Sequence, residues 1–390
     1  MHLILREDAG GLSAIETDAG PVVTRRVPAR DKKVRYDASL LPRLEKGKEY
    51  SSAEVVTGAM KVFARDPKVV SVDSDLASTS GLQAGIAAVD QNRAFNVGVA
   101  EANMMGIGEA FAALGCNTWV STFCPFFDWK VLRRIAVGYQ ERRESQGAQN
   151  GWLSEGHGLD LTFLATAANF ETRTNGATHM GNDDITVFDG IGHLQIVDVS
   201  CPRQLLAVMQ WIMDGNRGLV YLRVNRAAYP ALYGPEFTFE FGRGYVLRET
   251  AADQAVLVSS GRGVYEALAA AEECSRGGLA VTVVDMPSID EELLLRLHDS
   301  QKPVFLAEQN NGYIWQNFLK ILYRRRKFHG NPKRIVSINT LSAEGRPQFI
   351  HSGTYEELIE AFGLTRAKLA QTIREKLEEL LPPGFPDSLT

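Results

Sequence analysis

Short apolar runs of strand length alternate with amphipathic segments of helical period through the middle of the chain. The first four runs cover residues 69–72, 161–165, 194–199 and 218–222. Ser51 and Glu54 have the spacing of a capping box, which predicts the start of a helix, and a second helix is predicted over residues 102–114, before Gly115. Alternation of buried strands with helices is typical of a parallel sheet covered by helices on both faces.

The same alternation repeats in the second half of the chain. Strands are predicted at residues 255–260, 279–285, 303–308 and 334–338, and helices at 264–274 and 366–381. The turn-rich stretch 233–236 separates the halves. We therefore predict two consecutive three-layer α/β domains with mostly parallel sheets, covering residues 51–235 and 236–390. Residues 1–50 have no sustained period and are predicted to form an extension or arm.

Composition agrees with a soluble metabolic enzyme. The chain has 390 residues, 45% of them hydrophobic, and a formal net charge of −5. This charge disfavours a nucleic-acid partner, and the basic run 324–327 is interpreted as a solvated helix face. The four cysteines have no paired spacing that would indicate a zinc site or a disulfide framework. Without a run near twenty apolar residues we expect no membrane span, and a cytoplasmic location.

One carboxylate occupies a distinctive position just before the helix predicted at 102–114. Glu101 follows Gly98 and precedes Met104 and Met105, at a predicted strand-to-helix junction. A carboxylate withdrawn from water at such a place is suited to sharing a proton with a neutral heterocyclic nitrogen. The alternative interpretation is an acidic residue that only stabilises the helix N-terminus.

Aromatic residues recur every three positions shortly after that helix. Phe123, Phe126 and Trp129 lie where a predicted strand runs into a turn. On one face of an α- or 3₁₀-helix, three rings would form a stacking surface for a planar heteroaromatic ligand. Plain core packing is the alternative interpretation of the same pattern.

Together these segments resemble the pyrimidine-binding domain of transketolases and related thiamine diphosphate enzymes. Residues 98–106 match the pattern Gly-Val-x-Glu-x-x-Met-x-Gly, and residues 122–129 match Thr-Phe-x-x-Phe-x-x-aromatic. Three further segments match in the order of the family, at residues 72–76, 175–179 and 220–226. The resemblance extends over roughly residues 50–370.

The resemblance implies thiamine diphosphate as the cofactor and assigns residues to it. Glu101 would hydrogen-bond the ring nitrogen of the aminopyrimidine and would be essential for activating the cofactor. Phe123, Phe126 and Trp129 would form the pocket for that ring. Asp75 matches an aspartate that lies near the cofactor in the family.

The resemblance also assigns residues to a sugar-phosphate substrate. His179 matches a histidine that contacts substrate hydroxyls or phosphate. The resemblance therefore implies that His179 both binds substrate and takes part in catalysis. Arg226, or less favourably Arg223, would hold a substrate phosphate by forked hydrogen bonds. Asn175 stands where the family has a loop aspartate, and residues 167–170 replace the usual Thr-His-Asp segment. The residues that usually bind the sugar phosphate are therefore altered, and the sequence does not identify the sugar.

The family's diphosphate-binding domain has no counterpart in this sequence. Its Gly-Asp-Gly motif and downstream asparagine supply metal ligands, whereas Phe188-Asp189-Gly190 lacks the leading glycine. The resemblance therefore implies the C-terminal half of a split transketolase-like enzyme. A separate N-terminal subunit would hold the diphosphate and the Mg²⁺ or Ca²⁺ ion, so no metal site is expected here. Self-association to a dimer, in a two-plus-two heterotetramer, is the implied assembly.

Three other functions stay open beside ketol transfer. A 2-oxoacid dehydrogenase beta-type subunit would share the cofactor glutamate, although the residues at 122–129 and 175–179 favour the transketolase side. A 1-deoxyxylulose-phosphate synthase-like enzyme would use pyruvate as its donor. A non-catalytic scaffold subunit could keep the fold without the chemistry.

Overall fold

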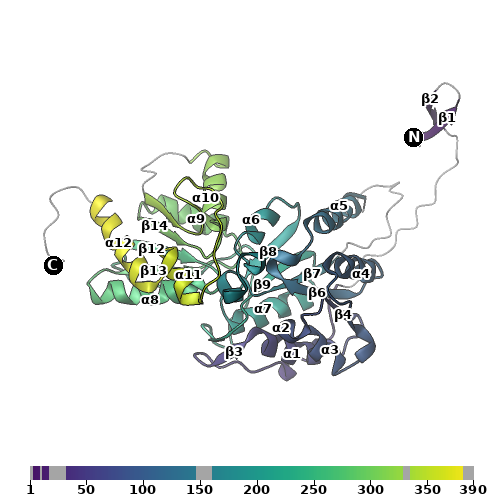
Figure 1. Ribbon diagram of the computed structural model, residues 1–390, viewed down its shortest axis with the longest axis horizontal. Helices are drawn as coiled ribbons and strands as arrows, with labels where there is room; N and C mark the ends of the chain where they lie inside the picture. Colours follow the sequence, from purple (N-terminus) through teal and green to yellow (C-terminus); the bar gives the residue numbers. More distant parts are fainter. Residues whose placement is uncertain (1–2, 9–10, 17–31, 146–159, 328–333, 381–390) are drawn as a thin grey trace.

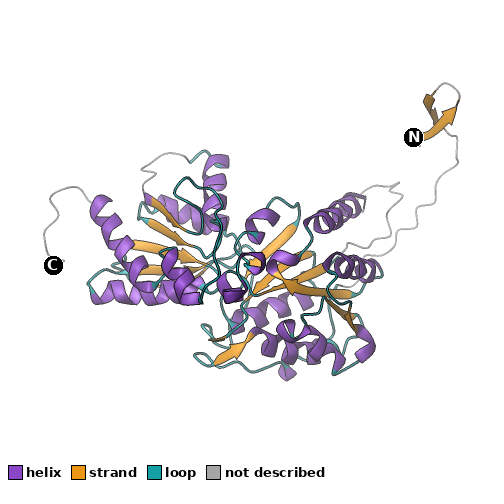
Figure 2. Ribbon diagram, in the orientation of Figure 1, coloured by secondary structure: helices purple, strands orange, loops and turns teal. Residues whose placement is uncertain are grey.

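The structure is a computed structural model that describes residues 3–8, 11–16, 32–145, 160–327 and 334–380. Within these residues two larger sheets lie side by side, each covered by helices (Figures 1 and 2). This architecture confirms the predicted fold class of two α/β units with mostly parallel sheets. The proposed boundary at residues 233–236 falls between the last strand of the first sheet and the first strand of the second.

The first sheet has six parallel strands among the described residues, in the order β5-β4-β6-β7-β9-β8. Its strands are β4 (Val69–Asp73), β5 (Ala94–Asn96), β6 (Asn117–Phe123), β7 (Leu161–Thr166), β8 (Leu194–Asp198) and β9 (Leu219–Val224). All residues of β4, β6, β7 and β9 are buried, as expected for a sheet with helices on both faces.

Helices cover both faces of this sheet. They are α1 (Ser52–Phe63), α2 (Ala77–Ser80), α3 (Leu82–Ala87), α4 (Glu101–Ala113), α5 (Trp129–Ser145), α6 (Asp184–Phe188) and α7 (Pro202–Met213). Because successive strand residues point to opposite faces, Val120 and Tyr221 pack with α4, α5 and α6, whereas Trp119 and Leu222 pack with α1, α3 and α7. Ser51 caps α1 by accepting a hydrogen bond from the Glu54 amide at 3.2 Å, which is one half of the predicted capping box.

Short 3₁₀ turns join several of these elements. They are η1 (Ala38–Leu40), η2 (Gln91–Arg93), η3 (Cys124–Phe126), η4 (Phe170–Asn175) and η5 (Ala177–His179). The turns η3, η4 and η5 all follow the carboxyl ends of β6 and β7, which places them at one edge of the sheet.

The second sheet has five strands among the described residues, in the order β11-β13-β12-β14-β15, and only β11 runs antiparallel. Its strands are β11 (Tyr245–Arg248), β12 (Ala255–Ser259), β13 (Val281–Asp285), β14 (Val304–Ala307) and β15 (Ile335–Ile338). Its helices are α8 (Gly263–Arg276), α9 (Glu291–Asp299), α10 (Tyr313–Arg324), α11 (Tyr355–Ala361) and α12 (Arg366–Leu380). In the predicted basic run, Arg324 and Arg325 form ion pairs with Glu291.

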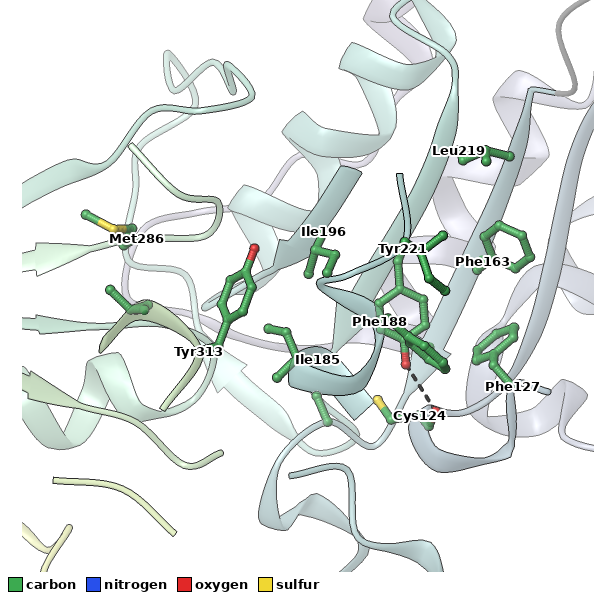
Figure 3. Close-up of a cluster of buried hydrophobic side chains, with 14 of the residues drawn as sticks. Cys124, Phe127, Phe163, Ile185, Phe188, Ile196, Leu219, Tyr221, Met286 and Tyr313 are labelled. Atoms are coloured by element: carbon green, nitrogen blue, oxygen red, sulfur yellow. Dashed lines mark hydrogen bonds between the residues drawn. The ribbon is translucent and has the colours of Figure 1, made fainter. Parts of the chain in front are cut away.

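One hydrophobic core continues from the first unit into the second. Tyr313 and Met286 of the second unit belong to the same buried cluster as Ile185 and Ile196 of the first (Figure 3). Polar contacts accompany this packing, because the Ser260 hydroxyl donates to the buried carboxylate of Asp198 at 2.7 Å. The carboxyl ends of the second sheet therefore face the first unit.

The N-terminal region is partly packed onto the first unit. Residues 3–16 contain an antiparallel pair, β1 (Leu3–Asp8) and β2 (Gly11–Glu16). Further along, Val34 and Leu44 are buried in the core, and β3 (Glu49–Ser51) pairs with β10 (Ala228–Pro230).

Residues 141–151, whose polar and glycine-containing composition is typical of an insertion or loop, lie partly within α5, and the remainder of this segment lies outside the described residues. No helix in the described part of the chain has the length and apolar character needed to cross a membrane.

Candidate functional site

The loops after β4 and β5 are cross-linked at the carboxyl edge of the first sheet. The Ser74 hydroxyl donates to the Gly98 carbonyl at 2.8 Å and accepts from the Ala100 amide at 3.1 Å. The Asn96 side-chain oxygen accepts from the backbone amides of both Asp75 and Gly98. Asp75 adopts a left-handed backbone with φ of 58°, and its side chain is exposed. These bonds fix Asp75 beside the turn that leads into α4.

Glu101 is the first residue of α4, directly after this turn. The helix can lie close to β6 because Gly108 has no side chain, since a Cβ there would sit 2.4 Å from Val120. The N-cap residue Ala100 provides no side-chain cap, so the acidic Glu101 stands among first-turn amides. The expectation of a carboxylate withdrawn from water is met only in part, because Glu101 is half-buried in this chain.

Two of the three predicted rings gather with His179. Phe123 ends β6 and Phe126 belongs to η3, and their ring centroids are 5.7 Å apart. The His179 imidazole, from η5, lies 4.9 Å from the Phe126 ring and 6.0 Å from the Phe123 ring. Trp129 begins α5, is 46% exposed and lies outside this ring cluster. The expectation of a single helical face is wrong, because the three residues belong to a strand, a 3₁₀ turn and an α-helix.

Arg226 joins the ring cluster from the segment after β9. Its guanidinium carbon lies 5.7 Å from the centroid of the Phe123 ring, and the side chain is exposed. The backbone amides of Arg226 and Ala227 donate to the carboxylate of Glu171 at 3.2 and 3.0 Å. Glu171 thus positions the Arg226 backbone, although it lies in a loop where sequence patterns indicated no buried acid.

Arg223 has a different environment and is fully buried. Its guanidinium forms ion pairs of 2.9 Å with both Asp184 and Asp198 and donates to the Gly181 carbonyl at 2.6 Å. Burial opposes its charge, but the two carboxylates hold the pKa of Arg223 well above its usual value. The geometry therefore distinguishes the two arginines, with Arg226 at the exposed ring cluster and Arg223 in the interior.

Asn175 lies at the end of η4, close to His179 in the chain, and is exposed. Between them Gly176 has a positive φ of 79°, and a Cβ there would lie 3.4 Å from the side chain of Ser352 in the second unit. The Thr178 hydroxyl contacts the His179 Nδ1 at 2.8 Å. The loop that carries Asn175 and His179 is therefore bounded by both units.

A buried carboxyl that the sequence analysis did not single out supports the loop after β4. Asp73 is the last residue of β4, and its Oδ1 accepts a hydrogen bond from the Ser80 hydroxyl at 2.7 Å. Burial raises the pKa of Asp73 to about 7, although the Ser80 bond acts in the opposite direction. The sequence feature that could have indicated this buried carboxyl is an acidic residue at the end of a mostly apolar strand.

The edge of the first sheet therefore combines a ring cluster, one carboxylate at a helix N-terminus and an exposed guanidinium. Such an arrangement suits a flat heterocycle beside an anionic substrate. Among the described residues no group of three His, Cys, Asp or Glu side chains is placed to hold a metal ion. The side chains fit an organic ring and a substrate anion better than a metal with its diphosphate.

Comparisons with known proteins identify both units. Residues 49–231 match the family description "Transketolase, pyrimidine binding domain", and residues 244–369 match "Transketolase, C-terminal domain". The chain is 26% identical to the "Putative transketolase C-terminal section" of Methanocaldococcus jannaschii, over 80% of this chain and 91% of that protein. It is also 26% identical to the "6-deoxy-6-sulfo-D-fructose transketolase subunit SqwH" of Clostridium sp., over 80% and 90% of the two chains.

A solved structure described as "Split gene transketolase, inactive beta4 tetramer" has the same fold. It superposes with a TM-score of 0.61 at 24% sequence identity and covers 84% of this chain and 98% of its own. The two family matches together take in most of the chain, in the order that the two sheets follow. The chain therefore belongs to the transketolase family, of which it carries the pyrimidine-binding and C-terminal domains.

Proposed function

We propose that this chain is the C-terminal subunit of a split transketolase-like enzyme. It would transfer a two-carbon ketol unit from a ketose or ketose phosphate to an aldehyde acceptor, with thiamine diphosphate as the cofactor. The grouping of two phenylalanines, an imidazole and an exposed guanidinium at one sheet edge carries this proposal. These groups are Phe123, Phe126, His179 and Arg226.

The residues at the edge fit the aminopyrimidine part of thiamine diphosphate. The cofactor supplies a carbon nucleophile that breaks and forms carbon–carbon bonds next to a carbonyl. Glu101 would share a proton with the aminopyrimidine ring nitrogen, while Phe123 and Phe126 contact the ring and Asp75 lies at its side. Trp129 would extend the apolar wall. A half-buried Glu101 suits this role if a partner surface completes the enclosure.

The substrate would lie between the ring cluster and the loop that carries Asn175. Arg226 would bind the substrate phosphate, because a guanidinium presents a fork of donors to phosphate oxygens. The His179 imidazole would contact a sugar hydroxyl and exchange a proton with it. An asparagine side chain both donates and accepts, so Asn175 would select hydroxyl groups by a pattern different from that of an aspartate.

The diphosphate and its Mg²⁺ or Ca²⁺ ion would be held by a separately encoded N-terminal subunit. Two relatives, named a "C-terminal section" and a "subunit" of transketolases, support this division of the enzyme between chains. Exposed apolar residues also lie near this edge: Val99 (80% exposed) follows β5, Trp129 (46%) begins α5 and Phe95 (37%) lies within β5. Such a patch is typical of a protein contact. The chain would self-associate to a dimer within a two-plus-two complex.

The first experiment is a calorimetric titration of thiamine diphosphate with Mg²⁺ into this chain, alone and together with a candidate N-terminal subunit. Because the diphosphate and metal ligands would come from the partner, we expect weak binding by the chain alone. The mixture should bind the cofactor and transfer ketol units from one of a panel of ketose phosphates. Glu101→Gln in this chain should nearly abolish turnover by the mixture.

Glu109→Gln is the matched control, because Glu109 lies on the same helix and pairs with Arg134 at the surface. That variant should keep the activity of the unmodified complex. Tight cofactor binding by the chain alone would contradict the proposed division of ligands. Pyruvate accepted as donor would indicate a deoxyxylulose-phosphate synthase-like enzyme, and decarboxylation a 2-oxoacid dehydrogenase. Full activity of the Glu101→Gln complex would indicate a scaffold subunit.

A further inference from the structure

A cavity lies at the edge of the second sheet that is away from the contact between the two units. Its volume is about 540 Å³, within the range of small-molecule sites. Lys302 and Pro303 precede β14, Arg334 precedes β15, and Leu377 and Arg374 come from α12. It therefore lies at the amino-terminal ends of the strands, whereas the carboxyl ends face the first unit.

Three cations line this cavity, and among the described residues none of them forms an ion pair within 4.0 Å. They are Lys302, Arg334 and Arg374. The buried carboxylate of Asp253 interacts electrostatically with Lys302 from a greater distance. Several other cations of the same unit form ion pairs. Arg276 pairs with Glu272 at 2.7 Å, Lys368 with Glu360 at 2.8 Å and Lys376 with Glu379 at 2.7 Å. A single carboxylate, that of Glu378, also lines the cavity. The lining thus carries an excess of positive charge in a concave surface, which favours anions.

Backbone carbonyls hold the two guanidinium groups in place. One terminal nitrogen of Arg334 donates to the Gln301 backbone carbonyl and, at 3.0 Å, to the Gln301 side-chain oxygen. One terminal nitrogen of Arg374 donates to the Glu273 carbonyl at 3.2 Å. Both arginines are half-buried. Neutral acceptors orient a guanidinium without neutralising it, so the charge stays available to a ligand.

Part of the remaining wall is apolar, beside the polar residues Gln254, Ser300 and Gln301. Leu279 is buried beneath it, and Pro303, Leu377 and Leu380 form further parts of the lining. An inorganic ion would contact the cations but leave this wall uncovered. The combination suits a ligand with an anionic head and an apolar body.

We propose that this cavity is a binding site for a small organic anion, with a phosphate or carboxylate head on an apolar body. The head would bind Arg334, Arg374 and Lys302, and the body would cover Leu279 and Leu377. This site is separate from the ring cluster at Phe123, and its existence does not depend on ketol transfer.

The test is calorimetric titration of the full chain with four probes. Phenyl phosphate and phenylacetate combine an anionic head with a ring, whereas inorganic phosphate and benzyl alcohol each carry one feature alone. We expect at least one of the ring-bearing anions to bind saturably with a Kd near or below about 1 mM. Inorganic phosphate and benzyl alcohol should bind at least about tenfold more weakly, and the better ring-bearing anion identifies the head group.

Variants place the binding in the cavity. Arg334→Gln and Arg374→Gln should each raise the Kd of the better-binding probe by about fivefold or more. Arg276→Gln, on the same unit but paired with Glu272, is the control and should leave binding unchanged. Thermal melting checks that all three variants fold, and a variant that does not fold is replaced by Lys302→Gln. The proposal is overturned if Arg276→Gln loses as much affinity for the probe as the cavity variants do, or if the cavity variants lose none. It is also overturned if neither ring-bearing anion binds saturably.

Discussion

Arg223 and Arg226 are close in the chain but have different environments, and we expect different roles for them. Arg223 forms ion pairs with two buried aspartates, whereas Arg226 is exposed above the Phe123 ring. We expect Arg226→Gln to raise KM for a phosphorylated donor about tenfold or more, with little change for an unphosphorylated donor. Steady-state kinetics of the complex with the two donors measure this difference.

Arg223→Gln is the contrasting variant at the same strand end. Removing the guanidinium leaves Asp184 and Asp198 buried without their counter-charge, which costs about 3–5 kcal/mol. Urea unfolding of the isolated chain should therefore show a large loss of stability for Arg223→Gln and none for Arg226→Gln. If both variants lost stability equally, the assignment of Arg226 to the substrate would lose its basis.

Residue patterns alone could predict the position of some side chains but not their partners. Arg223 and Arg226 lie an odd number of positions apart, so a strand pattern indicates opposite faces but not which face is buried. Glu171 lies in a loop rich in polar residues, yet its carboxylate accepts bonds from the Arg226 amide and from Arg262. Such long-range partners depend on tertiary packing, which a local sequence pattern does not contain.

At the scale of elements, β4 carries a buried carboxyl into the loop that holds Asp75. In the unfolded chain the pKa of Asp73 has its ordinary value of 3.8, and burial raises it to about 7 in the fold. The fold thus favours the protonated form, and this contribution is lost as the pH rises from about 4 through about 7. Between about pH 5 and about pH 7 the free energy of unfolding should therefore fall by about 2 kcal/mol less in Asp73→Asn than in the unmodified chain.

Urea unfolding at several pH values measures this change. Burial also raises the pKa of Asp285 to about 6 and of Glu308 to about 7, so part of the pH dependence should remain in Asp73→Asn. Asp75→Asn is the control, because it removes an exposed carboxylate from the adjoining loop. An unaltered pH profile in Asp73→Asn would mean that this carboxyl is ionised in the folded protein.

Most elements could be predicted because buried parallel strands have a simple composition. The run predicted at 69–72 is β4 (Val69–Asp73), and the helix predicted at 102–114 is α4 (Glu101–Ala113). The aromatic spacing was misleading because Phe123 ends a strand, Pro125 lies in a 3₁₀ turn and α5 begins only afterwards. A period of three has structural meaning only inside one continuous element.

At the scale of the whole molecule, Glu171 and Arg262 connect the two units. Their side chains are 0% and 13% exposed, and an Arg262 nitrogen lies 2.7 Å from the Glu171 carboxylate. Arg262→Met should lower the free energy of unfolding by about 2 kcal/mol, because a charged hydrogen bond is lost inside the contact. A double-mutant cycle with Glu171→Gln, followed by urea unfolding, should give a coupling of about 1–3 kcal/mol.

Arg276→Met is the surface control for this cycle, because its pair with Glu272 is exposed. That variant should unfold as the unmodified chain does. Additive losses in the cycle would mean that the pair contributes no coupling and that apolar packing around Tyr313 holds the units together.

The exposed apolar edge should determine whether the chain assembles. Val99 is 80% exposed directly before the helix that carries Glu101, and Trp129 and Phe95 extend the patch. Single exposed apolar residues are common, but a group beside a candidate site is typical of a protein contact. In Val99→Lys a contact would have to bury an unpaired ammonium group, so we expect a normally folded chain that fails to self-associate or to bind an N-terminal subunit.

Sedimentation velocity over a range of concentrations, with and without the N-terminal subunit, measures this association. Val246→Lys is the matched control, because Val246 is 48% exposed on β11 of the second unit, away from the patch. If Val99→Lys assembled like the control, the patch would be ordinary surface. If both lysine variants remained monomeric, added charge alone would explain the effect. Loss of assembly in Val99→Lys alone, with an unchanged melting temperature, would place the contact beside Glu101, where a second chain could complete the enclosure of the cofactor.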